Sequence, residues 1–183
     1  NYFPLMVGNN AFGGTFTARL MREIREKRGW SYGAYSLIYL GKEISTFVMR
    51  FYPAMKDTIP AIELSLQMLG DVAENGLKED EVEFSKSYLI NRFPFKIDTP
   101  MNKLRELVSI DLLGQPQDYL DKYVENVKSA GAGQVNGALK KKLSPSNLAI
   151  VIVGVAKELE PQLRNLKWVN SVTVQPYNED FKF

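Results

Sequence analysis

The chain has 183 residues and contains neither histidine nor cysteine. Without histidine it cannot build a histidine-ligated zinc site or a Ser-His-Asp triad, and without cysteine it has no thiolate ligand and no disulfide. The absence of cysteine fits the cytoplasm and the periplasm equally, so the compartment stays open. The 23 basic and 21 acidic residues nearly cancel, so neither a nucleic acid nor an anionic membrane is indicated as a partner. The longest apolar run, 148–156, is too short to span a bilayer.

What is present is an ordinary globular composition, 45% hydrophobic and 24% charged. This composition and length predict one domain over residues 1–183. Strand patterns come first, helical patterns follow, and one more strand pattern lies near the end of the chain. That order predicts an α+β fold, a two-layer sandwich with an antiparallel or mixed sheet and helices packed on one face.

The periodicity of apolar residues gives the expected elements. Helices are expected over 1–12, from 15 or 17 to 28, and over 57–76, 79–93, 99–113, 119–127, 134–143 and 157–163. Strands are expected over 31–40, 43–52, 147–155 and 172–174. Gly41 and Lys42 are expected to join the first two strands through a tight hairpin turn.

The informative stretch is 13–36, which is read as a helix, a glycine break and a strand. Phe16, Leu20 and Ile24 recur at helical spacing and predict one apolar face. Gly29 is expected to end the helix, because glycine readily adopts the left-handed backbone that a helix end requires.

Arg25 and Tyr32 lie seven residues apart, across that glycine break. The break places the arginine in the last helical turn and the tyrosine at the start of the strand, so that both side chains can point into the same mouth. A charged guanidinium and a neutral phenol suit a peptide carbonyl, or the oxyanion that the carbonyl becomes. The structural alternative is also open, because arginine late in a helix favours the helix dipole and tyrosine packs well in strands.

These residues resemble the carboxyl-side half of pitrilysin/insulinase-type zinc metallopeptidases. The matching features are the glycine pair Gly13-Gly14, the helix end IREKRGWSYGAYS, the segment KEDEVEFSKSYL and the strand LAIVIVG. The match runs from about residue 1 to residue 154, which is most of the chain. Each short motif is weak alone, but the arginine–tyrosine pair in this context is fairly specific.

The resemblance implies that Arg25 and Tyr32 are the catalytic residues of a half that holds no zinc. It implies that a partner half, in the same polypeptide or in a separate subunit, carries the H-x-x-E-H motif and the zinc. Peptide substrates would be held in a closed chamber between the halves, and this chain, a fragment of the larger peptidase, would be inactive alone. Exposed interface would favour binding to that half or formation of a homo-oligomer.

Two other interpretations remain. The same family includes structural subunits, so the chain is alternatively a catalytically inactive scaffold. A free-standing nucleic-acid-binding domain is disfavoured by the balanced charge. Two further motifs favour structural roles: Gly8–Gly14 lacks the lysine of a phosphate-binding loop, and the acids at 79–81 suit a helix start.

Overall fold

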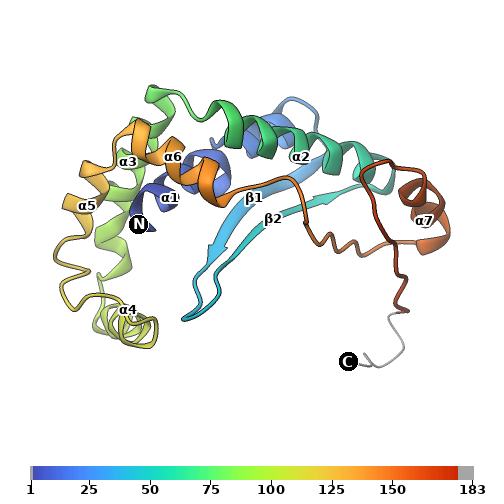
Figure 1. The fold of residues 1–183 in the computed structure, drawn as a ribbon. Helices are drawn as coiled ribbons and strands as arrows, with labels where there is room; N and C mark the ends of the chain where they lie inside the picture. The colour runs from blue at the N-terminus through green and yellow to red at the C-terminus, as the bar shows by residue number, and fades with distance from the viewer. Residues whose placement is uncertain (1, 177–183) are drawn as a thin grey trace.

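The computed structural model describes residues 2–176. Its helices form an arch over a long two-stranded hairpin, with α4 near one end of the arch and α7 at the other (Figure 1). The helices and turns of helix are α1 (Tyr2–Asn9), η1 (Asn10–Gly14), η2 (Met21–Glu26), η3 (Met55–Asp57), α2 (Thr58–Asn75), α3 (Glu79–Arg92), η4 (Phe93–Lys96), α4 (Pro100–Leu112), α5 (Tyr123–Ser129), α6 (Ala132–Lys142) and α7 (Ala156–Arg164).

The hairpin consists of β1 (Ser31–Tyr39) and β2 (Thr46–Pro53), which pair in antiparallel fashion. Tyr39 lies opposite Thr46 in the register. Both strands were predicted by their alternating apolar residues, and they form. The prediction of a tight turn at Gly41 and Lys42 is wrong. Strand pairing stops at Tyr39, and a six-residue loop, 40–45, joins the strands. Glycine and charged residues in this loop have low strand propensity, which ends the ladder early.

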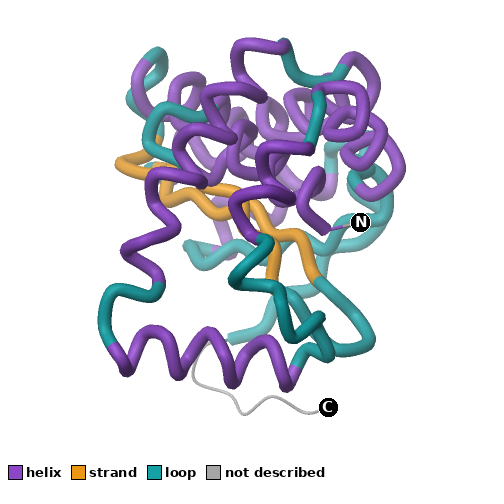
Figure 2. Tube along the Cα trace, turned by 90° about the vertical axis from the view of Figure 1, so that its left-hand side faces the viewer, coloured by secondary structure: helices purple, strands orange, loops and turns teal. Residues whose placement is uncertain are grey.

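Helices α1, α2 and α6 lie on one side of the hairpin (Figure 1), and in the perpendicular view most of the helical chain again lies on one side of the strands (Figure 2). The predicted α+β class with helices on one face of the strands is therefore confirmed. The core between the layers is apolar, and its fully buried members include Val7, Phe12, Leu20, Ile24, Leu69, Val72, Val127, Val135 and Leu139. Burial of such side chains is the main force that holds the helices on the hairpin.

A buried polar network fixes the glycine-rich stretch that leads into η1. The Asn10 amide donates to Ser85 Oγ at 2.9 Å, and Ser85 Oγ donates to the Val7 carbonyl at 2.7 Å. Ser36 Oγ on β1 donates to the Asn9 carbonyl at 3.3 Å. Because these bonds join the end of α1 and the start of η1 to α3 and β1, the stretch has the structural role that its sequence favours.

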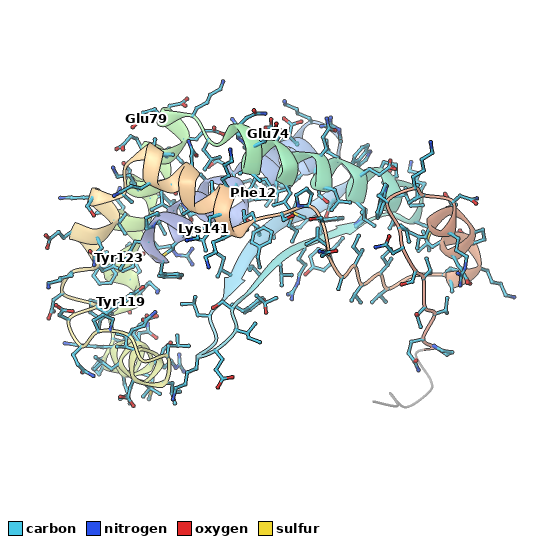
Figure 3. All side chains as sticks on the ribbon, in the orientation of Figure 1. Phe12, Glu74, Glu79, Tyr119, Tyr123 and Lys141 are labelled. Carbon is cyan, nitrogen blue, oxygen red and sulfur yellow. The ribbon has the colours of Figure 1, made fainter. Side chains whose placement is uncertain are left out.

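An aromatic cluster packs at the start of α5. Tyr123 stacks on Phe93 with ring centroids 4.3 Å apart, and Phe3 stacks on Tyr119 at 5.3 Å. Figure 3 shows Tyr119 and Tyr123 close to each other in the part of the chain between α4 and α5. Burial raises the pKa of Tyr123 to about 12, which marks an apolar setting. The predicted helix start at Tyr119 is wrong, because residues 117–122 form turns and α5 begins at Tyr123.

The predicted strand at 147–155 does not form in the structure. Residues 148–153 are assigned to no strand, and Val151 and Val153 are 90% and 98% exposed. A buried strand needs a neighbouring strand to complete its hydrogen bonds, and among residues 2–176 β1 and β2 pair only with each other. For the same reason 172–174 form no strand. The helix predicted at 157–163 is present as α7.

Candidate functional site

The helix that carries Arg25 ends where the sequence predicts. Gly29 has a φ of +63°, and its amide donates to the Arg25 carbonyl at 2.9 Å. The Trp30 amide then donates to the Ile24 carbonyl at 3.0 Å. These bonds satisfy carbonyls of the last turn and turn the chain directly into β1.

The start of that helix differs from the prediction. The helix was expected to start at Thr15 or Thr17, but residues 15–18 form a turn and helical structure begins at Arg19. Within η2 the spacing widens to a π-turn, in which the Lys27 amide donates to the Arg22 carbonyl at 2.9 Å. The helix that carries Arg25 therefore starts later than predicted and is largely π-helical.

The structure brings Arg25 and Tyr32 together. The guanidinium carbon of Arg25 lies 5.0 Å from the centroid of the Tyr32 ring. The same carbon lies 4.2 Å from the centroid of the Phe16 ring. Both contacts are within the range of cation–π attraction. Tyr32 is 85% exposed, so its hydroxyl faces outward and not into the core. The predicted pair, Arg25 and Tyr32, is thus part of a surface cluster that also includes the Phe16 ring.

One carboxylate on the same helix, that of Glu23, is held by other cations. Glu23 accepts from Lys27 and from Arg28, at 2.5 Å and 2.7 Å. The hydrogen bond from Lys27, helped by Arg28 and opposed by burial, lowers the pKa of Glu23. Within residues 2–176 the Arg25 side chain forms no ion pair and no hydrogen bond, so its donors stay available to a ligand.

A second carboxylate near the start of the helix is also occupied. Arg19 contacts Glu81 through Nε and Nη2, both at 2.6 Å, and Arg22 approaches the same carboxylate at 3.6 Å. Burial alone would raise the pKa of Glu81, but the Arg19 hydrogen bonds, the Lys78 amide and the two guanidinium charges lower it. Glu81, which the sequence placed at a helix start, lies in the first turn of α3. Its contacts with Arg19 and Arg22 anchor the Arg25-bearing helix to α3, and its carboxylate forms no ion pair with Arg25.

Phe16 is the residue of this cluster that sequence reasoning missed. Its helical spacing with Leu20 and Ile24 predicted burial, but it lies in the turn and is 53% exposed. An exposed aromatic side chain next to an unneutralised arginine is the signal that could have identified it. That signal exists only when the two side chains are known to be close.

No metal site is apparent in the part of the chain that the structure describes. Residues 2–176 contain no group of three or more acidic, histidine or cysteine side chains arranged to hold a metal ion. The same residues contain no helix long and apolar enough to cross a bilayer.

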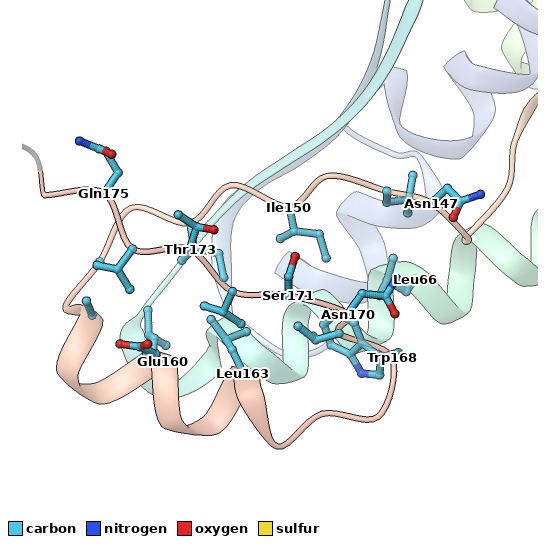
Figure 4. Close-up of a pocket in the computed structure, with 18 of the residues that line it drawn as sticks. Leu66, Asn147, Ile150, Glu160, Leu163, Trp168, Asn170, Ser171, Thr173 and Gln175 are labelled. Atoms are coloured by element: carbon cyan, nitrogen blue, oxygen red, sulfur yellow. The ribbon is translucent and has the colours of Figure 1, made fainter. Parts of the chain in front are cut away.

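A cavity of about 620 Å³ lies at the other end of the chain, between α2, α7 and the extended segments around them. Figure 4 shows Leu66, Ile150, Leu163 and Trp168 around this space. Neither Arg25 nor Tyr32 belongs to its lining. The lining is mainly apolar or uncharged, so the cavity does not contribute to the guanidinium cluster.

Comparison with known proteins shows which family this chain is similar to. Residues 1–89 match the family model described as the peptidase M16 inactive domain. A crystal structure of a peptidase M16 inactive domain from Pseudomonas fluorescens shares the fold, with a TM-score of 0.72 and 24% identity over 79% of this chain and 34% of that chain. The family predicted from the sequence is confirmed by this match of residues 1–89 to the peptidase M16 inactive-domain model.

Two curated relatives extend the likeness further along the chain. One, named "Non-peptidase homolog YmxG", is from Helicobacter pylori and is 22% identical over 80% of this chain. The other, named "Uncharacterized zinc protease YmxG", is from Bacillus subtilis and is 22% identical over 82%. This chain spans 34% and 37% of their respective lengths. It is therefore similar to the inactive-domain part of longer zinc-protease-like proteins.

Proposed function

We propose that this chain is the zinc-free half of a two-half peptidase and that Arg25 and Tyr32 bind the carbonyl of the peptide bond to be cleaved. The observation that carries the proposal is the Arg25 guanidinium, which is held against the Tyr32 ring at 5.0 Å and has no carboxylate partner among the described residues. An arginine that is not neutralised in the protein keeps its charge and its fork of donors for a ligand.

The chemistry follows from how the two donors respond to charge. When the carbonyl becomes tetrahedral its oxygen gains negative charge, and a nearby cation and phenol stabilise that charge more than they stabilise the neutral carbonyl. Arg25 also binds the ground-state carbonyl, because its charge attracts the carbonyl dipole. Tyr32, which offers one O–H, acts mainly on the charged state.

The zinc of such a peptidase is assigned to the partner half. This chain has no histidine or cysteine, and residues 2–176 contain no suitable acidic cluster, so its residues do not fit a zinc site. We assign the H-x-x-E-H motif, the metal and the activated water to the other half. The two halves would close a chamber around the peptide, and this chain would be inactive without its partner.

A scaffold role is the second candidate. The Helicobacter pylori relative is named a non-peptidase homolog, so a chain of this kind does not require catalysis. In a scaffold the Arg25 and Tyr32 side chains would stabilise the fold or a subunit interface. The retained pair and its unneutralised guanidinium favour the catalytic role.

The substitution Tyr32→Phe separates these two functions. It removes one hydroxyl and keeps the ring that contacts Arg25, so we expect thermal stability to stay unchanged. Loss of one donor to the tetrahedral oxygen typically costs about 3 kcal/mol, on the order of a hundredfold in kcat. The measurement is the hydrolysis of a fluorogenic peptide by this chain assembled with the zinc-bearing half.

Tyr39→Phe is the matched control, because it removes the same hydroxyl from the far end of the same strand. It should leave kcat unchanged. If Tyr32→Phe keeps kcat/KM within about twofold of the wild type, less than about 1 kcal/mol, the catalytic role is wrong. The scaffold role would then explain the pair better.

A further inference from the structure

The ring of Phe16 lies closer to the Arg25 guanidinium than any other aromatic ring in the described chain, 4.2 Å from its carbon to the centroid. Tyr32 lies at 5.0 Å from the same carbon. The planar guanidinium is therefore bounded by two aromatic side chains, one from a turn and one from β1. Among residues 2–176 no carboxylate shares in holding it.

From this geometry we infer that Phe16 is a positioning residue for Arg25. Arginine has a long side chain with several rotatable bonds, so a free guanidinium loses rotamer entropy when it binds a ligand. A ring that already holds the guanidinium removes part of that cost before the substrate arrives. A carboxylate would hold it equally well but would occupy its donors, whereas a ring face leaves the edge donors free.

The position of Phe16 is itself fixed by its neighbours. Thr15 and Ala18 are buried on either side, and the Ala18 amide donates to the Thr15 carbonyl at 3.3 Å. Arg19 follows directly and is anchored by its two contacts with Glu81. Phe16 is therefore 53% exposed but lies on a turn whose neighbouring residues are anchored.

The catalytic consequence of this inference rests on the proposed function, but its geometric part does not. Nuclear magnetic resonance of the Arg25 Nε–Hε group measures the geometry directly, because an aromatic ring face shifts that proton signal upfield. In the wild-type chain we expect the Arg25 Hε signal to be shifted upfield. We expect Phe16→Leu to reduce the shift to the smaller contribution of the Tyr32 ring, and Phe16→Tyr to restore it.

The kinetic arm uses the same variants in the assembled peptidase. Phe16→Leu should lower kcat/KM about tenfold, mainly by raising KM, and Phe16→Tyr should recover most of the loss. Tyr88→Leu is the matched control, because it removes a ring 5.9 Å from another guanidinium, that of Arg92 on α3. The control should leave kcat/KM unchanged.

The outcomes distinguish this inference from the proposed function. An unshifted Arg25 signal in the wild type overturns the positioning role, whatever the kinetics. If Phe16→Leu lowers kcat/KM without altering the Arg25 signal, Phe16 contacts the substrate itself and the inference is also wrong. If the Arg25 signal behaves as expected but Arg25→Ala leaves kcat/KM unchanged, the geometry stands and the proposed function fails.

Discussion

The contact between Arg19 and Glu81 gives the sharpest prediction of stability. Two guanidinium nitrogens meet the two carboxylate oxygens at 2.6 Å, and the side chains are 17% and 16% exposed. The Glu81 carboxylate also accepts from the Lys78 amide at 2.9 Å, which caps the start of α3. Glu81→Gln removes the charge while keeping the shape of the side chain.

The expected loss lies between two known limits. Exposed ion pairs contribute about 0–1 kcal/mol, and removing one partner of a fully buried pair costs about 3–5 kcal/mol. This pair is mostly buried but retains contact with solvent, and glutamine keeps one acceptor for Arg19. We therefore expect Glu81→Gln to lower the free energy of unfolding at pH 7 by about 2 kcal/mol.

The loss should depend on pH in a defined direction. The pKa of Glu81 is lower in the folded protein than its usual value of 4.5. A carboxyl with a lowered folded pKa stabilises the protein above its unfolded pKa, and that stabilisation is lost as pH falls through the folded value. The difference between wild type and Glu81→Gln should therefore be full at pH 7 and narrow steadily below about pH 4.5.

Urea unfolding followed by tryptophan fluorescence, repeated from pH 7 to pH 3, measures this dependence. Glu83→Gln is the matched control on the same helix, where the Glu83 side chain is 54% exposed and pairs with Lys86 at 2.7 Å. The control should change the free energy by less than about 0.5 kcal/mol. Equal losses for Glu81→Gln at pH 7 and pH 3 would refute the electrostatic reasoning, and so would a loss no larger than that of the control.

Two further predictions concern packing and metal. An added Cβ at Gly13 would lie 2.6 Å from the Ser36 backbone nitrogen, so Gly13→Ala should lower the free energy of unfolding by about 1–3 kcal/mol. An added Cβ at Gly137 would meet nothing within 4 Å, so Gly137→Ala should be neutral or stabilising in thermal melts. The isolated chain should retain no stoichiometric zinc after dialysis, because it has no histidine or cysteine; metal analysis that finds one zinc per chain, together with peptidase activity, would overturn the assignment of the metal to a partner half.

The sequence alone determined the features that depend on local chemistry. Apolar periodicity and caps predicted α2, α3, α4 and α7 closely, because helical hydrogen bonds are made within the segment itself. Gly29 was recognised as a helix end because few other residues adopt a φ of +63°. The absence of histidine and cysteine excluded a zinc site of the usual kind without any structure.

Only the tertiary structure decided the features that need a partner distant in the sequence. The apolar run at 148–153 reads as a buried strand, yet it forms none because a strand needs a second strand to complete its hydrogen bonds. Phe16 reads as a core residue, yet it contacts the Arg25 guanidinium because residues 15–18 turn before the helix begins. Arg25 itself is distinguished from the other arginines nearby by which carboxylates are already occupied, Glu23 by Lys27 and Glu81 by Arg19. Such competition among charges is set by distances in space, and residue spacing along the chain does not encode it directly.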